Sequence, residues 1–282
     1  MLIEQVIEPL SSSMRLWQRS RKKAAKFRSS EVMLLRYPKS GVTWLRVMVS
    51  HIYQGRQKIE SSEIIGSRKF HQMVPDAPRV SIGEHIIDPR LTREMMAAIG
   101  HKKAILLIRD PRDVAVSMYF HLAKRSTPLE RAVYRIPKGF EADGIFRFTM
   151  DPVYGLANII RFMNIWWPCV NGAPNSLIIR YEAMRASPGA ILSETMRFLG
   201  LEARPSEIEE SVAFASLDSM KERERSGFFR SEILRPGDKN DEDSYKVRKG
   251  EVGGYVQHFT PLQISQINAL LHTTLDERIG YT

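Results

Sequence analysis

The stretch Val32–Leu45 reads Val-Met-Leu-Leu-Arg-Tyr-Pro-Lys-Ser-Gly-Val-Thr-Trp-Leu. Its first five residues form a short apolar run typical of a buried strand, and a turn then leads into a helical pattern. A turn between a parallel strand and a helix aims backbone N–H groups and the positive end of the helix dipole at one point, which favours an anion. The turn also supplies Lys39, the hydroxyls of Ser40 and Thr43, and Gly41, which lets a ligand approach the backbone closely.

This turn resembles a P-loop in design but lacks the pattern G-x-x-x-x-G-K-[ST], so a nucleoside triphosphate with magnesium is not its natural ligand. Taken alone, the turn is equally compatible with a generic strand–helix connection that carries surface polar residues. The choice between an anion site and a plain turn therefore depends on the rest of the chain.

The same strand-then-helix order recurs twice. Ala104–Ile108 is an apolar run that ends at Arg109-Asp110-Pro111-Arg112-Asp113, and a helical pattern follows. Leu177–Ile179 is a third short strand, followed by a helix around Ile191–Leu199. Strands that alternate with helices predict a central parallel sheet with helices on both faces, so the fold class is α/β with a single three-layer α/β/α domain. Residues 221–250 form the most polar stretch and predict a long surface loop.

Two further elements have the chemistry of phosphate binding. Arg109 follows a predicted strand at its carboxyl end, where ligands bind in open α/β sheets, and Ser117 lies on the helix that follows. An arginine and a serine together can hold a phosphate. Arg248-Lys249-Gly250 is a third basic element, placed after the polar loop. Each could be a solvated charge, but three such elements in one domain favour a ligand with several phosphates.

Composition limits the classes of partner. The 282 residues are 43% hydrophobic and 26% charged, as in a soluble globular protein, and carry a net charge of +10. That excess predicts a nucleic acid, an acidic membrane or a phosphate-rich small molecule as partner. Basic residues gather at strand–helix turns rather than in a stripe interleaved with aromatics, so we expect no nucleic acid. The single cysteine, Cys169, excludes an intramolecular disulfide framework and a cysteine-based zinc site.

Residues 1–30 stand apart as a basic amphipathic arm. Their apolar residues recur at helical spacing: Ile3, Val6, Ile7, Leu10, Met14 and Trp17. Seven basic residues follow between Arg15 and Arg28. Two interpretations stay open, a helix docked on the domain and a helix lying on an anionic membrane. We expect a cytoplasmic protein, peripheral to the inner face of a membrane if the arm binds lipid, because no apolar run is long enough to span a bilayer.

The motifs together resemble those of the PAPS-dependent sulfotransferases, which take a sulfuryl group from 3′-phosphoadenosine 5′-phosphosulfate (PAPS). Residues 37–45 look like the 5′-phosphosulfate loop of that family, and residues 109–117 are similar to its 3′-phosphate segment. Arg248-Lys249-Gly250, followed by Gly253-Gly254 and His258-Phe259-Thr260, resembles its late nucleotide-binding motif. The resemblance spans about residues 31–275, and it implies a sulfotransferase domain over 31–282. The implied product is adenosine 3′,5′-bisphosphate (PAP), and no metal is required.

By this resemblance, the donor site has three parts. The 5′ end and one side of the adenine are assigned to Lys39, Ser40, Gly41, Val42, Thr43 and Trp44. The 3′-phosphate is assigned to Arg109, Ser117, Arg248, Lys249 and Gly250. The surroundings of the base are assigned to Tyr181, Ser216 and Met220. Ala215 and Leu217 stand where threonine and phenylalanine are common in the family.

Three residues are candidates for the chemistry. Lys39 would stabilise charge on the leaving oxygen, as an acid or electrostatically. His85 is the candidate general base, because its ordinary pKa lies near neutral pH and relatives place a histidine at a comparable point. Glu84 is the rival base, since carbohydrate-acting relatives use a glutamate. A purely structural role for His85 also stays open, because Gly83-Glu84 replaces the Lys-Thr pair that usually precedes the histidine.

The acceptor is not named by the sequence. A carbohydrate, a lipid-linked glycan, a phenol or a small alcohol would each fit. Aromatic residues in the expected acceptor loops suggest an apolar or sugar-stacking pocket: Phe70, His71, Tyr134, Phe140, Phe146, Phe148, Phe228 and Phe229. The alternatives to a sulfotransferase are a nucleotide-dependent kinase for a small metabolite and a basic nucleic-acid-binding protein.

Overall fold

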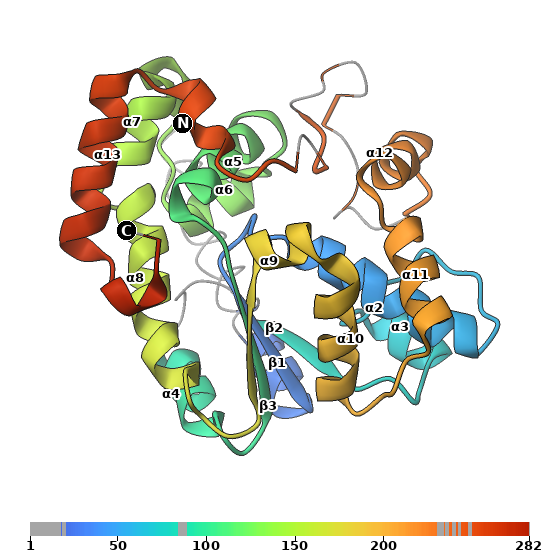
Figure 1. Cartoon of the computed structure of the whole chain (residues 1–282). Coiled ribbons are helices and arrows are strands. Elements are labelled where there is room, and N and C mark those ends of the chain that lie inside the picture. The colour runs from blue at the N-terminus through green and yellow to red at the C-terminus, as the bar shows by residue number, and fades with distance from the viewer. Residues whose placement is uncertain are drawn as a thin grey trace, which may run out of the picture.

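The centre of the molecule is a parallel sheet. The structure, a computed structural model of the 282-residue chain, describes residues 18, 21–83, 89–229, 234, 237–238, 241, 244–247 and 250–281. In these ranges the sheet has four strands, in the order β2-β1-β3-β4 (Figure 1). They are β1 (Val32–Arg36), β2 (Val80–Gly83), β3 (Lys103–Ile108) and β4 (Ser176–Arg180). All three pairings are parallel, with Val32 opposite both Val80 and Lys103.

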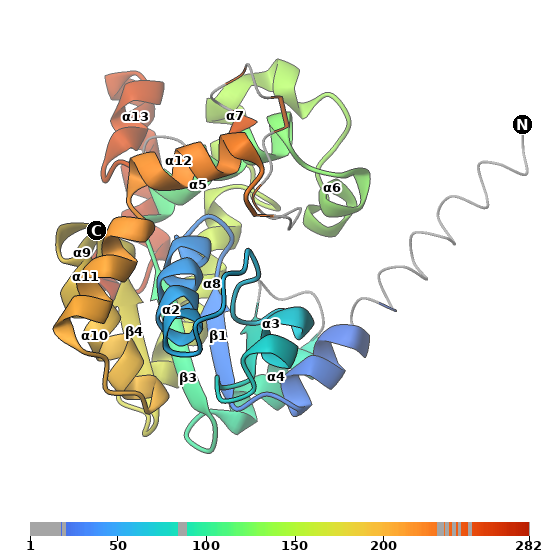
Figure 2. The same cartoon turned by 90° about the vertical axis from the view of Figure 1, so that its right-hand side faces the viewer.

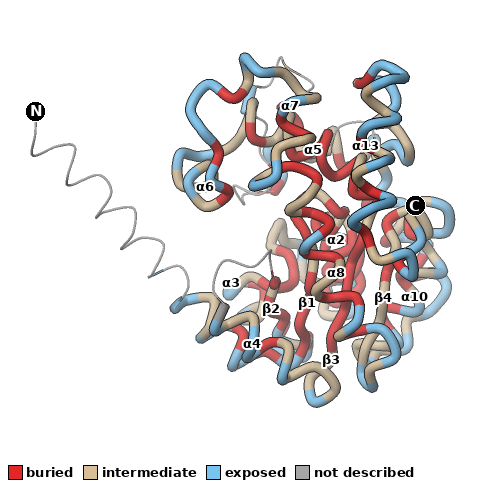
Figure 3. Tube along the Cα trace, turned by 90° about the vertical axis from the view of Figure 1, so that its left-hand side faces the viewer, coloured by how far each residue is buried: buried red, intermediate tan, exposed pale blue. Residues whose placement is uncertain are grey.

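Side chains of the strands alternate between two cores. Val32 and Leu34 of β1 pack into one apolar cluster, whereas Met33 and Leu35 pack into the other. Strands that are buried on both faces read as continuous apolar runs, which is why the strand segments were visible in the sequence. Figure 3 shows the strands buried and the outer sides of the helices exposed. The predicted three-layer α/β/α domain is confirmed.

Helices cover the two faces (Figures 1 and 2). The first face packs against α2 (Val42–Arg56), α3 (Arg68–Met73), α9 (Tyr181–Ala186), α10 (Pro188–Leu199), α11 (Pro205–Phe214) and α12 (Leu217–Ser226). The second packs against α4 (Pro89–Ala98), α5 (Pro111–Lys124), α6 (Pro128–Tyr134), α7 (Gly144–Met150), α8 (Leu156–Val170) and α13 (Pro261–Thr274). Short 3₁₀ turns complete the second layer at Phe140–Asp143, Gly254–His258 and Glu277–Ile279.

The sequence predicts a surface loop over residues 221–250, but part of this polar stretch is helical. Its first residues belong to α12, which begins after the Ser216 side-chain cap and ends at Gly227 in the left-handed conformation. Local caps suffice to start and stop a helix whose own residues are mostly charged. Glu224, on this helix, is fully buried and accepts hydrogen bonds from the backbone N–H groups of Lys246 (2.7 Å) and Val247 (3.0 Å). The carboxylate therefore ties segment 244–247 to the domain.

The basic half of the N-terminal arm contacts the domain where the structure describes it. Residues 21–28 are helical, and Phe27 is buried in the second core. Lys26 donates to the carbonyl of Gly66, and Arg28 pairs with Glu94 at 2.9 Å. The apolar positions from Ile3 to Trp17 lie outside the described residues, so binding of the arm to a membrane stays a prediction. Among the helices that the structure describes, none is both long and apolar enough to cross a bilayer.

Candidate active site

The β1–α2 turn is built to hold an anion. Lys39 and Gly41 have positive φ angles of 72° and 97°, which curl the backbone around the start of α2. Gly41 precedes the helix and no side chain caps it, so the first turn of α2 presents its backbone donors to a ligand. Ser40 is fully buried, and its Oγ makes no hydrogen bond to any described residue. A Cβ at position 41 would lie 2.6 Å from the Tyr181 ring, so the turn requires glycine there.

Arg109 stands at the end of β3 beside this turn. Its guanidinium donates to the carbonyl of Glu251 (2.8 Å), pairs with Asp113 (3.5 Å) and lies 4.2 Å from the centroid of the Tyr181 ring. Its Nε has no partner among the described residues. These contacts fix the plane of the guanidinium while one donor stays available to a ligand.

Asp113 joins the late motif to this corner, a role that the sequence analysis missed. Its carboxylate accepts hydrogen bonds from the backbone N–H groups of Gly253 (2.9 Å) and Tyr255 (3.0 Å). Gly250 and Ser117 line the same cavity as Arg109. Arg248 and Lys249 lie outside the described residues.

An aromatic slot adjoins the turn. The rings of Trp44 and Tyr181 meet edge to face with centroids 6.2 Å apart, and the Arg185 guanidinium lies 5.4 Å from the centroid of the Trp44 ring. Trp44 Nε1 donates to the carbonyl of Ala215 (2.8 Å), which fixes the indole. Met220 also lines the cavity here. The slot has the shape and the π surfaces to hold a flat heterocycle.

Ser216 is placed differently from the sequence assignment. It is not among the residues that line the cavity, whereas its neighbours Ala215 and Leu217 are. The Ser216 hydroxyl instead accepts a hydrogen bond from the backbone N–H of Ser219 at the start of α12. A residue that caps a helix directs its hydroxyl at the helix end, and contact of Ser216 with the base stays a prediction.

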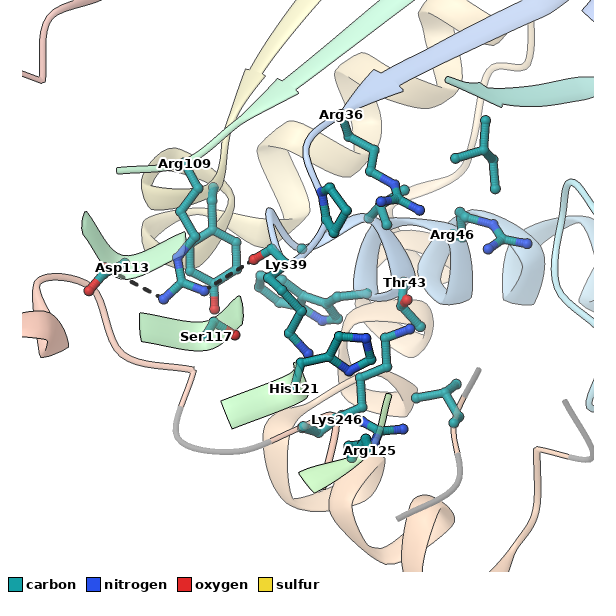
Figure 4. A pocket seen from close by; sticks show the side chains of 18 of the residues that line it. Arg36, Lys39, Thr43, Arg46, Arg109, Asp113, Ser117, His121, Arg125 and Lys246 are labelled. Carbon is teal, nitrogen blue, oxygen red and sulfur yellow. Dashed lines mark hydrogen bonds and ion pairs between the residues drawn. The ribbon is translucent and has the colours of Figure 1, made fainter. Parts of the chain in front are cut away.

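One cavity of about 900 Å³ is lined by Lys39, Gly41, Trp44, Arg109, Ser117 and Tyr181, whereas Ser40 is not among its lining residues. Its opposite side carries a second set of cations, which we call the basic cluster: Arg36, Arg46, Arg125 and Lys246. Figure 4 shows the cluster across the cavity from Arg109, Asp113 and Ser117, with Lys39 between the two sets. None of its four members stands out in the sequence, because they come from four segments and belong to no motif.

Burial sets the electrostatics of the basic cluster. It lowers the pKa of the Arg46 guanidinium to about 9, and the charge of Arg36 adds to the effect. The pKa of the Lys246 ammonium lies well below its ordinary range, through burial and then the charges of Lys39 and Arg125. These shifts have the sign expected for cations that are desolvated beside other cations.

His121 lines the same cavity between Lys39 and the basic cluster. Burial lowers its pKa to about 4, although Glu130 lies 3.6 Å from its Nε2. The imidazole is therefore neutral at pH 7. The sequence analysis gave His121 no role, since a histidine in the middle of a helical pattern has no distinguishing local signal.

The expected aromatic acceptor pocket is wrong for most of the residues named. Among them only Tyr134 lines the cavity. Phe70, Phe140 and Phe148 are instead among the largest fully buried side chains of the two cores. Spacing alone does not separate a pocket aromatic from a core aromatic, since both occur in apolar surroundings.

The two candidate bases, His85 and Glu84, lie outside the described residues. Ser81, Ile82 and Gly83, which precede them on β2, line the cavity. His85 and Glu84 therefore directly follow a part of the chain that lines the cavity.

Comparison with known proteins defines the class. A sulfotransferase domain model matches residues 29–278, so the chain belongs to the sulfotransferase domain family. A guinea pig (Cavia porcellus) 3-alpha-hydroxysteroid sulfotransferase is 27% identical over 90% of this chain and 85% of its own. Cytosolic sulfotransferase 16 of Arabidopsis thaliana is 24% identical over 86% of this chain and 75% of its own.

Solved structures share the fold. Mouse sulfotransferase SULT7A1 complexed with PAP superposes with a TM-score of 0.58, at 22% identity over 87% of this chain and 84% of the other. Retinol dehydratase in a complex with retinol and PAP gives a TM-score of 0.59, at 16% identity over 87% and 81% of the two chains. Family and fold together identify the protein as a PAPS-dependent sulfotransferase.

The residues present fit this co-substrate. The buried Ser40 Oγ and the Arg109 Nε have no hydrogen-bond partner among the described residues, and the uncapped start of α2 lies beside them. We call this set, Ser40, Gly41, Arg109, Ser117 and Tyr181, the nucleotide side. The aromatic rings of Trp44 and Tyr181 adjoin the β1–α2 turn.

Proposed function

We propose that the protein transfers the sulfuryl group of PAPS to an acceptor hydroxyl by in-line displacement assisted by a general base. The observation that carries the proposal is one cavity of about 900 Å³ that is lined by residues of the β1–α2 turn, among them Lys39, and by Arg109. A carbohydrate, a lipid-linked glycan and a small alcohol are the acceptor classes considered.

In the proposed reaction, the acceptor oxygen forms a bond to sulfur while the bond from sulfur to the bridging oxygen breaks. The electron pair of that broken bond stays on the 5′-phosphate of PAP. Charge grows on this oxygen in a loose transition state, and Lys39 together with the start of α2 stabilises it. Arg109 and Ser117 hold the 3′-phosphate, which does not react, and so they position the donor.

The acceptor proton goes to a base that enters the cavity from the end of β2. His85 is proposed for this role, with Glu84 as the alternative. His85→Gln is expected to lower kcat by roughly 10²–10⁴-fold with little change in PAP affinity. Glu84→Gln is the matched variant, because it replaces the adjacent candidate and retains its size. Full activity of the His85 variant beside an inactive Glu84 variant would move the role to the glutamate.

A ligand screen followed by an acceptor screen tests the proposal. PAP alone should stabilise the protein against heat, whereas ATP with magnesium and oligonucleotides should not. A library of hydroxylated compounds incubated with isotope-labelled PAPS should then yield a sulfated product by mass spectrometry, and Lys39→Met should remove it. Stabilisation by ATP with magnesium instead of PAP would favour the kinase alternative.

A further inference from the structure

We propose that Glu182 is a positioning residue of the donor site, whose carboxylate holds Arg109 against Tyr181 and so aims the guanidinium at the 3′-phosphate. The inference rests on the proposed function, because it uses the role which that function gives to Arg109. Arg109 and Tyr181 line the cavity, whereas Glu182 is not among the lining residues. Glu182 therefore acts on the donor through these two neighbours.

The carboxylate of Glu182 joins the ends of two neighbouring strands. Strands β3 and β4 pair in parallel, and each is followed directly by a residue of the nucleotide side, Arg109 after β3 and Tyr181 after β4. Glu182 Oε1 accepts a hydrogen bond from the backbone N–H of Asp110 (2.8 Å), the residue after Arg109. This bond fixes the separation of the two backbones at the point where the side chains of Arg109 and Tyr181 leave them.

The second oxygen of the carboxylate is held as well. Glu182 Oε2 accepts a hydrogen bond from the Tyr281 hydroxyl (2.7 Å). Burial raises the pKa of Tyr281, and the charge of Glu182 adds to the effect, so the hydroxyl is protonated and donates at neutral pH. Because each oxygen has its own donor, the orientation of the carboxylate is set before a ligand arrives.

Tyr281 is in turn tied back to Asp110. Arg112 donates to the backbone carbonyl of Tyr281 (3.3 Å) and pairs with the Asp110 carboxylate (2.8 Å). The Arg180 guanidinium lies 5.0 Å from the centroid of the Tyr281 ring. The contacts form a closed circuit from Asp110 through Glu182, Tyr281 and Arg112 back to Asp110. Hydrogen bonds in such a network support one another, so each limits the movement of the rest.

The circuit adjoins the contact between Arg109 and Tyr181. The guanidinium lies 4.2 Å from the centroid of the ring, so a shift of either backbone changes the direction in which its donors point. Asp113 and the carbonyl of Glu251 also hold the guanidinium, but neither ties the backbone of Arg109 to that of Tyr181. A charged donor contributes most to affinity when its position is fixed beforehand. Glu182 is therefore expected to affect the affinity for a nucleotide that carries a 3′-phosphate.

Calorimetry on the full-length protein tests the inference with two probes, PAP and adenosine 5′-phosphate, which lacks the 3′-phosphate. Glu182→Ala should raise the dissociation constant of PAP about tenfold, the equivalent of one charged hydrogen bond. It should change the dissociation constant of adenosine 5′-phosphate by less than about twofold. Glu194→Ala is the matched control, because Glu194 is an exposed glutamate on α10, and it should change neither constant.

Three further variants separate positioning from a general loss of stability. Glu182→Gln keeps an oxygen for the Asp110 N–H and an amide that can donate to the Tyr281 hydroxyl, so it should restore most of the PAP affinity. Tyr281→Phe keeps the ring but removes the donor to Glu182, so it should weaken PAP binding by a smaller factor. In an Arg109→Met background, Glu182→Ala should have almost no further effect, because the group that it positions is already gone. Should Glu182→Ala not fold, Tyr281→Phe replaces it in the comparison of the two nucleotides.

The outcomes separate this inference from the proposed function. Glu182→Ala with the PAP affinity of the wild type would overturn the inference. An equal loss of affinity for both nucleotides, or an unchanged loss in the Arg109→Met background, would also overturn it, because Glu182 would then act on the fold as a whole. In each of these cases the proposed function stands, since it needs PAP binding and not Glu182. If Arg109→Met binds PAP as the wild type does, the role given to Arg109 fails and this inference fails with it.

Discussion

The nucleotide side and the basic cluster hold positive charge in opposite ways. On the nucleotide side, Arg109 is fixed by Asp113 and by the carbonyl of Glu251, so a cation is paired and aimed before any ligand arrives. In the basic cluster, Lys246 has Lys39 and Arg125 as charged neighbours. The first arrangement is preorganised for an anion of known shape. In the second, burial and neighbouring cations lower the pKa of Lys246, while Arg125 has the buried carboxylate of Glu224 at 3.8 Å.

The difference teaches how cations on the wall of one cavity can contribute either to affinity or to stability. A preorganised cation contributes to affinity because it loses little freedom on binding. Cations that are buried beside one another lower the stability of the protein. The basic cluster is therefore expected to affect stability, and the nucleotide side to affect affinity.

The largest effect on stability is expected at the carboxylate that anchors the basic cluster. Glu224→Ala removes the acceptor of two backbone N–H groups and a carboxylate 3.8 Å from Arg125. A fully buried charged partner of this kind is worth about 3–5 kcal/mol of unfolding free energy. Urea denaturation measures the loss. Glu222→Ala, on the same helix and exposed, should change stability by less than about 1 kcal/mol. Equal losses in the two variants would mean that segment 244–247 is not anchored by Glu224.

A pH-dependent effect is expected at His121. Its pKa is about 4 in the folded protein and near 6.5 when unfolded, so the unfolded chain binds more protons between these values. Stability should therefore be constant above pH 6.5 and fall as the pH drops toward 4, by about 3 kcal/mol in all. His121→Gln should remove this part of the acid destabilisation. His272→Gln, at an exposed position, should not. Lys246→Met should narrow the pH range over which stability falls, because the charge of Lys246 contributes to lowering the pKa of His121.

A smaller loss of stability is expected at Asp113, which pairs with Arg109 on the nucleotide side. Asp113→Asn keeps the size of the side chain but removes the charge that faces Arg109 and the two backbone donors of Gly253 and Tyr255. We expect a loss of about 1.5–3 kcal/mol, the range for hydrogen bonds to a charged group. Chemical denaturation measures it, with Asp143→Asn as the exposed control. A loss no greater than that of Asp143→Asn would show that Asp113 does not hold the site together.

Much of the nucleotide side could be predicted from the sequence, because its residues belong to short segments with recognisable patterns. Ser40 and Gly41 lie in one turn, and Arg109 follows an apolar strand directly. The three strands with continuous apolar runs were predicted for the same reason. The order of the strands in the sheet depends on pairing between distant segments.

The basic cluster was not readable because its members are far apart in the chain. Arg36, Arg46, Arg125 and Lys246 each look like an ordinary surface charge until the fold brings them to one wall. Helix α12 was missed because its caps outweigh a composition that resembles a loop.

The affinity of Arg109→Met for PAP, measured by calorimetry beside the wild type, tests the central claim most directly. Arg109 is assigned to a phosphate that does not react, so its loss should appear in binding itself. The account predicts a dissociation constant roughly 10–100-fold higher, the equivalent of one charged hydrogen bond or more. A dissociation constant equal to that of the wild type would contradict the assignment of the nucleotide side.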